Sequence, residues 1–261
     1  MKKSETINYI TNWIQGYHNK NKVEGLVIGV SGGIDSALTS TLCALTGLKT
    51  LCLNMPIRQQ EEQFNRASKH IKWLKNKYNN VNSINIDLTP FFEKFQSTVD
   101  TNAEKSELAL ANSRSRMRML TLYYYAGINN SIVVGTGNKV EDFGIGFYTK
   151  YGDGGVDISP VADLMKSEVF ELSKHLKIND DILNAPPTDG LWDDDRNDED
   201  QIGVSYKDLE NIMLRLEKGE DPKGFSNKIK SYYEIYMGHH NGNKHKMVEI
   251  PVCKIPSKLK L

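Results

Sequence analysis

A short loop of glycine, serine and aspartate constrains the fold of this chain more than any other feature. The loop is Ser31-Gly32-Gly33-Ile34-Asp35-Ser36. The residues before it, 25–30, are a run of Gly, Leu, Val and Ile that is typical of a strand buried on both faces of a parallel sheet. The residues after it, 37–45, are rich in Ala and Leu and predict a helix. A strand, a glycine loop and a helix in this order predict the first crossover of an α/β fold.

The remainder of the N-terminal half alternates between strand and helix patterns. An amphipathic helix, with Ser4 as its expected N-cap, comes before the glycine loop. Such alternation predicts right-handed crossovers, and therefore a doubly wound parallel sheet with helices on both faces, a Rossmann-like three-layer sandwich. We expect helices at 4–18, 60–78 and 103–125, and strands at 48–54, 83–88 and 131–135.

The C-terminal third has helix patterns but no second set of strands, so we expect one domain over residues 1–261. The segment 190–203 holds six acidic residues and few side chains that could be buried, which predicts a mobile loop. A basic tail begins at Lys244. Helices are expected at 163–176, 206–217 and 225–239.

Charge and hydropathy exclude several classes of protein. The chain has 33 Lys and Arg residues and 33 Asp and Glu residues, and a net charge of zero argues against a general nucleic-acid binder. No run of 18 apolar residues is present, so no membrane partner is expected. The first residues lack the apolar stretch of a secretion signal. These features predict a cytoplasmic protein.

The glycine loop (31–36) suits a phosphate group. The N-terminus of the following helix offers unpaired N–H groups and partial positive charge, and the glycines let the main chain approach an anion. Asp35 would repel phosphate unless a metal ion lay between them. The loop has neither the lysine of a Walker motif nor the spacing of the dinucleotide fingerprint. The alternative interpretation is a tight turn that ends in an N-cap.

The loop resembles the Ser-Gly-Gly-x-Asp-Ser motif of the N-type ATP pyrophosphatases, which bind the pyrophosphate of ATP there and cleave between its α and β phosphates. Later motifs are similar to those of one branch, the NAD synthetases, and this resemblance runs from about Ile7 to Lys246. The fold that it implies is the adenine nucleotide alpha hydrolase-like fold. The most specific motif is Phe147-Tyr148-Thr149-Lys150-Tyr151-Gly152-Asp153-Gly154-Gly155, and the others lie at 115–119, 133–141 and 244–246.

The resemblance implies three groups of site residues. Asp35 and Glu141 would hold Mg²⁺ as the cofactor. The residues that would bind nicotinic acid adenine dinucleotide (deamido-NAD) are Arg116, Lys150, Asp157, His245 and Lys246. The ATP site would consist of Gly29, Val30, Ser31, Gly32, Gly33, Ile34, Asp35, Ser36, Thr136, Lys166 and Thr188.

The resemblance also implies a reaction and its partners. ATP would activate the nicotinate carboxylate of deamido-NAD as an adenylate, with release of pyrophosphate, and ammonia would then form NAD as AMP leaves. This is the last step of NAD biosynthesis, carried out by a ligase that forms a C–N bond. Asp153 is the candidate for accepting a proton from ammonium, and Lys166 for stabilising the departing pyrophosphate. The family is homodimeric, and no amide-hydrolysing domain precedes residue 23, so free ammonia or a partner would supply the nitrogen.

Two departures from the family pattern and several alternatives accompany this interpretation. The chain has Gly-Thr-Gly-Asn-Lys where the family often has Gly-Thr-Asp-His, and the stretch from Glu141 to Lys150 is one residue longer than in many members. Asp153 could be an ordinary turn aspartate, and Lys166 a surface lysine on a helix. The rival functions are another enzyme of the superfamily, such as a tRNA thiolase or the ATPase of GMP synthetase, and a non-catalytic nucleotide sensor.

Overall fold

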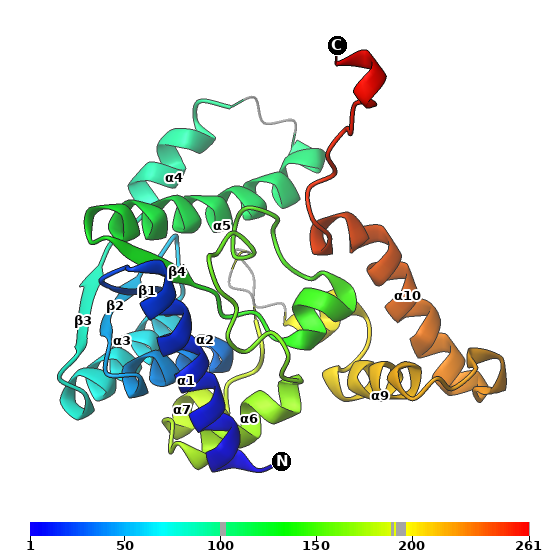
Figure 1. Cartoon of the computed structure of the whole chain (residues 1–261), viewed down its shortest axis with the longest axis horizontal. Helices are drawn as coiled ribbons and strands as arrows, with labels where there is room; N and C mark the ends of the chain where they lie inside the picture. The colour runs from blue at the N-terminus through cyan, green and yellow to red at the C-terminus, as the bar shows by residue number, and fades with distance from the viewer. Residues whose placement is uncertain (100–102, 189–190, 192–196, 261) are drawn as a thin grey trace.

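A parallel sheet of four strands lies toward one side of the molecule, which we describe from a computed structural model for residues 1–99, 103–188, 191 and 197–260 (Figure 1). The strand order is β3-β2-β1-β4, and all neighbouring strands run parallel. In the register of the central strands, Val27 lies opposite both Leu51 and Val133. The strands are β1 (Gly25–Gly29), β2 (Lys49–Asn54), β3 (Val81–Asn85) and β4 (Ser131–Val134).

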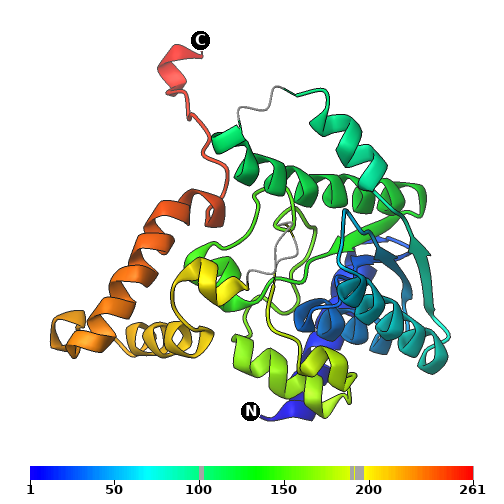
Figure 2. The same cartoon turned by 180° about the vertical axis from the view of Figure 1, so that it is seen from behind.

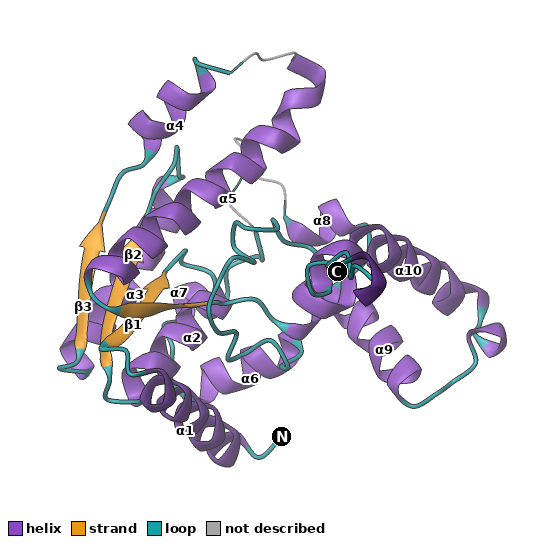
Figure 3. Cartoon of the chain, turned by 45° about the horizontal axis from the view of Figure 1, so that its top comes forward, coloured by secondary structure: helices purple, strands orange, loops and turns teal. Residues whose placement is uncertain are grey.

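Helices cover both faces of this sheet, as the alternating pattern predicts (Figure 3). Leu26 and Ile28 of β1 pack in a cluster with α1, α2, α3 and α6, whereas Val27 between them packs on the other face with α4 and α5. Successive side chains of a strand point to opposite faces, so a strand that is apolar throughout needs two helical layers. The bounds are α1 (Lys3–Asn21), α2 (Ile34–Leu45), α3 (Glu61–Lys77), α4 (Thr89–Gln96), α5 (Ala103–Ile128) and α6 (Lys166–His175).

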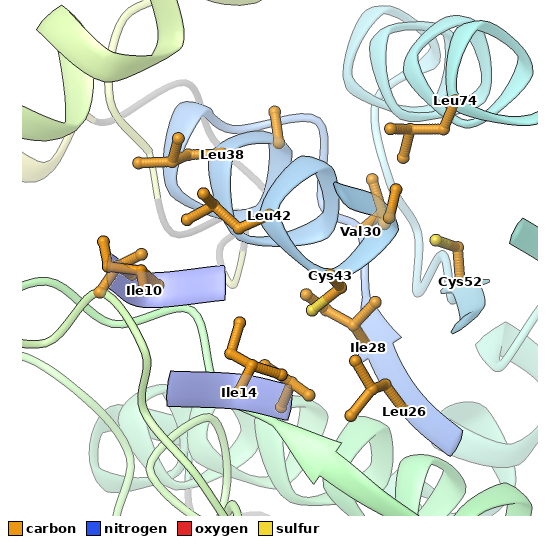
Figure 4. Close-up of a cluster of buried hydrophobic side chains, with 14 of the residues drawn as sticks. Ile10, Ile14, Leu26, Ile28, Val30, Leu38, Leu42, Cys43, Cys52 and Leu74 are labelled. Carbon is orange, nitrogen blue, oxygen red and sulfur yellow. The ribbon is translucent and has the colours of Figure 1, made fainter. Parts of the chain in front are cut away.

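The larger of the two apolar layers lies between β1 and the helices α1 and α2 (Figure 4). Ile14 of α1 and Leu38 and Leu42 of α2 are fully buried there, together with Ile28 of β1. Burial of such side chains contributes about 1.5–3 kcal/mol each relative to exposure. This layer fixes α2, and therefore the glycine loop at its N-terminus, against the sheet.

A smaller helical unit stands beside the sheet and has its own apolar cluster (Figure 2). Leu209 and Ile212 of α9 and Tyr236 of α10 pack there against Val140 and Ile145 of the π-helix η1. No helix in the described part of the chain is long and apolar enough to span a bilayer. The remaining elements are η1 (Val140–Ile145), α7 (Asp180–Leu183), α8 (Asp198–Ile202), α9 (Tyr206–Glu217), η2 (Pro222–Gly224), α10 (Asn227–Met247) and η3 (Ser257–Leu259).

Several predicted boundaries are wrong. Ser4 lies inside α1, whose N-cap is Lys2. The third strand begins at Val81 and ends at Asn85, because its partner β2 ends at Asn54, and the helix α4 was not expected. The basic tail is also different, because α10 continues to Met247.

The predicted loop at 190–203 is only partly within the described residues. Residues 190 and 192–196 lie outside them. The segment 197–203 is not a loop, because Asn197 caps the short helix α8 through its side chain, and Asp198 in that helix is buried. An acidic residue is seldom buried without partners, so its position indicates a role in the interior.

His70 is a buried histidine that predicts how stability depends on pH. Its ring is fully buried between α3 and α2, with Nε2 3.0 Å from Ser40 Oγ, and burial lowers its pKa to about 4. Below pH 6.5 the folded state therefore binds fewer protons at this residue than the unfolded state does. The contribution of His70 to the free energy of unfolding is fully present above pH 6.5 and is lost as the pH decreases toward 4. We expect a loss of about 3 kcal/mol from this group over that window.

Urea unfolding at pH 7, 5 and 4 measures this effect. The variant His70→Gln is expected to show a shallower pH dependence than the wild type, because glutamine does not titrate. His175→Gln, at an exposed position, is the control and is expected to leave the dependence unchanged. An equal slope for His70→Gln and the wild type would contradict the prediction.

Candidate active site

A cavity of about 480 Å³ opens where the chain leaves the carboxyl ends of β1 and β4. Ligands of open α/β sheets bind at this edge. The cavity wall contains every residue that the family resemblance assigns to ATP and to the metal, together with Asp153. These residues are Gly29, Val30, Ser31, Gly32, Gly33, Ile34, Asp35, Ser36, Thr136, Glu141, Asp153, Lys166 and Thr188.

The glycine loop is held in shape by its own serines. Ser31 Oγ accepts the Gly33 N–H at 3.2 Å and lies 3.1 Å from Ser36 Oγ, and Ser36 Oγ also donates to Gly33 O at 3.0 Å. Gly32 has a φ of +85°, which non-glycine residues rarely adopt. Gly33 is the N-cap of α2 and has no side chain to satisfy the helix N–H groups, which leaves them available to an anion.

One buried lysine joins the two carboxylates that were predicted to bind metal. Lys166 Nζ donates to Asp35 Oδ2 at 2.7 Å and to Glu141 Oε1 at 2.8 Å. The side chains of Lys166 and Asp35 are only 15% and 17% exposed, so this is an interior ion cluster and not a surface pair. The interpretation of Lys166 as a surface lysine is therefore wrong.

Two residues that were not predicted as site residues hold this cluster in place. Asn138 Nδ2 donates to Asp35 Oδ1 at 3.0 Å, and the side-chain oxygen Oδ1 of Asn138 accepts the N–H groups of Val140 and Glu141. The Tyr206 hydroxyl donates to Glu141 Oε1 at 2.6 Å. Asn138 stands in the Gly-Thr-Gly-Asn-Lys departure, whereas Tyr206, 65 residues beyond Glu141, carries no local signal.

The charges of the cluster follow from burial and pairing. Burial alone would lower the pKa of Lys166, but Asp35 and Glu141 raise it far above its usual value, so this side chain carries its charge at neutral pH. Burial would raise the pKa of Glu141, and attraction to Lys166 brings it below the usual value. Burial keeps the pKa of Asp35 raised.

Asp153 lies in a tight turn at another part of the cavity wall. Its Oδ1 accepts from Ser115 Oγ at 2.6 Å and from the Thr149 N–H at 3.0 Å, and burial raises its pKa. The unpredicted Asp142 also lines the cavity, and burial together with the neighbouring carboxylates raises its pKa well above the usual value. Two carboxylates in a largely buried wall favour a bound cation.

Four of the five residues predicted to bind deamido-NAD form a second cluster at the end of α10. Arg116 Nε donates to Lys150 O at 3.3 Å, and Lys150 Nζ donates to His245 O at 2.9 Å. Lys246 Nζ donates to Gly146 O at 2.9 Å and to a second carbonyl, and burial lowers its pKa. These side chains do not line the described cavity but surround the segment 146–150 next to it.

The fifth residue, Asp157, lies apart from this cluster. Its Oδ2 accepts the Val133 N–H of β4 at 2.7 Å, and its Oδ1 accepts from the Tyr123 hydroxyl of α5 at 3.0 Å. Within a single chain its contacts are therefore with the end of the sheet and α5.

The stretch from Glu141 to Lys150, which the family pattern predicts to be one residue longer than in many members, begins within the π-helix η1. A π-helix contains more residues per turn than an α-helix. The carbonyls at the end of η1 are satisfied from α10, since Asn243 donates to Ile145 O at 2.9 Å and His240 Nδ1 lies 2.8 Å from Gly144 O.

The comparisons with known proteins point to one family. The NAD synthase family model matches residues 6–247. The NH(3)-dependent NAD(+) synthetase of Mycoplasma genitalium is 37% identical over 206 residues, which cover 78% of this chain and 80% of that protein. The protein of the same name from Syntrophomonas wolfei is 33% identical over 264 residues and matches 100% of both chains.

A solved structure described as NMN synthetase from Francisella tularensis is similar over nearly the whole chain. The TM-score is 0.84, the sequence identity is 33%, and the match covers 98% of this chain and 99% of that one. The two chains are therefore similar in three-dimensional fold as well as in sequence. The matched length includes the smaller helical unit.

Proposed function

The chain belongs to the NAD synthase family, and we propose that it converts deamido-NAD and ammonia to NAD with the consumption of ATP. The reaction forms a C–N bond, so the protein is a ligase, and an adenylated intermediate leads to release of pyrophosphate and AMP. The convergence of the glycine loop with Asp35, Lys166 and Glu141 in one cavity is the observation that supports this function at the level of the site. We also propose that the reaction takes place in the cytoplasm.

The proposed first step needs positioning and charge, without a protein nucleophile. The nicotinate carboxylate attacks the α-phosphorus of ATP, and the bond between that phosphorus and the oxygen of the departing pyrophosphate breaks. N–H groups of the glycine loop and the Lys166 ammonium face the charge that develops on pyrophosphate. Asn138 and Tyr206 keep the lysine cluster in a single arrangement, which avoids reorganisation during the reaction.

The donor set fits Mg²⁺ as the proposed cofactor. Asp35 and Glu141 supply carboxylate oxygens, which Mg²⁺ prefers. The described residues contain no group of three His, Cys, Asp or Glu side chains placed around one ion. Phosphate and water would therefore supply the other ligands, as is usual for Mg²⁺. The bound ion would neutralise charge on the phosphates.

An assay of products tests the proposed function. The whole protein with ATP, Mg²⁺, ammonium and deamido-NAD is expected to give NAD, AMP and pyrophosphate in equal amounts. Formation of ADP would overturn the proposal, because cleavage between the α and β phosphates yields AMP. Release of AMP without any amide would indicate an ATP pyrophosphatase that acts on another substrate.

A second candidate function is amidation of the corresponding mononucleotide, nicotinic acid mononucleotide, to NMN. The observation that favours it is the TM-score of 0.84 and 33% identity to a protein described as NMN synthetase. Both reactions use the same chemistry at the nicotinate carboxylate and differ in whether an adenylate half is present on the substrate. The ratio of kcat/KM for the two substrates in a direct competition decides between them.

We propose that two copies of the chain associate through an apolar surface of α1 and α5, here called the α1–α5 face. Its exposed members are Tyr9, Trp13, Leu120, Tyr124 and Ile128. Large exposed apolar surfaces mark association sites in general. In a dimer, the dinucleotide would extend toward this face, where Asp157 contacts Tyr123.

A charge in the α1–α5 face is expected to separate the subunits. For Tyr124→Glu we predict a monomer in sedimentation experiments, with a KM for deamido-NAD raised at least about tenfold and ATP binding nearly unchanged, because burying an unpaired charge is unfavourable. Phe91→Glu, at an exposed position of α4, is the control. A Tyr124→Glu variant that stays dimeric would contradict this choice of surface.

A further inference from the structure

Arg66 is a partly buried charged residue next to the buried side of α3. Ala67, His70, Ile71 and Leu74 form the buried side of this helix, and Arg66 lies one turn before His70 in the same row. Its Nε is buried without a hydrogen-bond partner. Within the part of the chain that the structure describes, the Arg66 side chain makes no hydrogen bond or close ion pair, and its charge acts at longer range on Asp181. A buried donor without a partner costs about 1–3 kcal/mol, so this arrangement needs an explanation.

The glycine loop packs directly on this part of α3. A Cβ added to Gly32 would lie 2.7 Å from the Gln63 carbonyl oxygen and 3.2 Å from Arg66 Cβ. Gly32 is therefore required both for its φ of +85° and for the close approach of the two segments. Arg66 also lines the cavity, as do the residues of the glycine loop.

The other cations of the cavity wall are already engaged by the protein. Lys166 pairs with Asp35 and Glu141. Arg118 donates from Nε to Met55 O at 3.1 Å and from a terminal nitrogen to the Gln59 side chain at 2.9 Å. Among the cations that line the cavity in the described part of the chain, Arg66 differs from both. No protein oxygen of that part accepts a hydrogen bond from its guanidinium group.

The charge balance of the site also calls for a further cation. Asp35, Glu141 and Lys166 together carry a net charge of −1 when all three are ionised, so the cluster with the proposed Mg²⁺ would carry +1, which is less than the negative charge of a triphosphate. The glycine loop contains no lysine, so its own contribution to phosphate binding comes from main-chain N–H groups. A triphosphate beside this cluster needs positive charge on its other side, and a guanidinium matches phosphate oxygens in a bidentate manner.

We propose that Arg66 is a binding residue for the pyrophosphate end of ATP, and that it contacts the β and γ phosphates from the α3 side of the glycine loop. The inference rests on the proposed use of ATP by this cavity, and it names a residue that neither the sequence motifs nor the family resemblance assigns. Arg66 would hold the leaving group and would not touch the nicotinate carboxylate or ammonia.

Calorimetric titration of the whole protein with ATP, pyrophosphate and AMP, each with Mg²⁺, tests the proposal. For Arg66→Met we expect affinity for ATP and for pyrophosphate to fall about 10- to 100-fold, because charge-assisted hydrogen bonds are lost. Affinity for AMP, which lacks the β and γ phosphates, is expected to stay within about twofold. Arg66→Lys should recover part of the lost affinity, since lysine restores the positive charge but not the bidentate hydrogen-bonding geometry of the guanidinium group.

The control is Lys69→Met, one turn further along the same helix, where the lysine pairs with Asp181 at 2.7 Å outside the cavity. Its affinities are expected to match those of the wild type. Unchanged ATP and pyrophosphate affinity in Arg66→Met would overturn the proposal, and so would an equal loss for AMP, which would indicate a structural role. These titrations need no dinucleotide, so a wild type that binds ATP but forms no amide would refute the proposed function and leave this test valid.

Discussion

Lys166→Met is expected to lower kcat for amide formation by about 10³-fold or more, since it removes the cation proposed to face the departing pyrophosphate. The same change leaves Asp35 and Glu141 buried next to each other without their shared partner. Breaking a buried ion cluster in this way costs about 3–5 kcal/mol. The variant is therefore expected to lose stability as well as activity, which urea unfolding and pyrophosphate release measure separately.

Two further variants separate these effects. Lys166→Arg keeps the charge and is expected to recover most of the stability but little activity, because the guanidinium cannot repeat the geometry of two contacts at 2.7 and 2.8 Å. Lys139→Met is the matched control, because Lys139 pairs with Glu217 at 2.8 Å outside the cavity. Full turnover by Lys166→Met would refute the proposed role of this lysine.

The sheet was predictable from the sequence because its signals are local. The apolar run at 25–30 predicts a strand with two covered faces, and β1 has helices on both. The end of the third strand was less predictable, because the alternating residues Ile84, Ile86 and Leu88 look like one continuous strand. In the structure Leu88 instead bonds to Pro56 O and leads into α4, so the length of the neighbouring strand decides where β3 ends.

Site residues that belong to a sequence motif could be predicted. Site residues that depend on contacts between segments distant in the sequence could not. The glycine loop, Glu141 and Lys166 were identified from motifs and lie in one cavity. Tyr206 was missed because its contact with Glu141 depends on how α9 packs against η1. Asp198 was assigned to a mobile acidic loop, although its side chain is buried and its Oδ2 lies 3.3 Å from the Tyr206 hydroxyl.

The resemblance assigned His245 and Lys246 to deamido-NAD binding but says little about the conformation of this segment. His245 and Lys246 belong to a helix that reaches Met247, so they are held in place before any substrate arrives. Lys246 satisfies carbonyls of Gly146 and Tyr148. Binding deamido-NAD through this lysine would therefore require exchange of these two hydrogen bonds for contacts with the substrate.

Asp153→Asn is expected to lower kcat/KM for ammonium by about 10²–10⁴-fold, the usual contribution of general base catalysis. The proposed role of Asp153 is to accept a proton from ammonium, which frees ammonia to attack the adenylate, and its raised pKa makes it a better proton acceptor than an exposed aspartate. Asparagine has nearly the same shape and can keep the contact with Ser115, so the turn should remain folded. ATP affinity is expected to be unchanged. AMP release without amide formation should increase, because the longer-lived adenylate is then hydrolysed by water.

Hydroxylamine distinguishes a proton acceptor from a residue that only shapes the turn. Hydroxylamine is largely unprotonated near neutral pH, so it needs no base before it attacks. If Asp153 acts by accepting a proton, Asp153→Asn should use hydroxylamine almost as well as the wild type while it remains poor with ammonium. Equal losses with both nucleophiles would instead place Asp153 among the residues that support the wall of the cavity, together with Ser115 and Thr149.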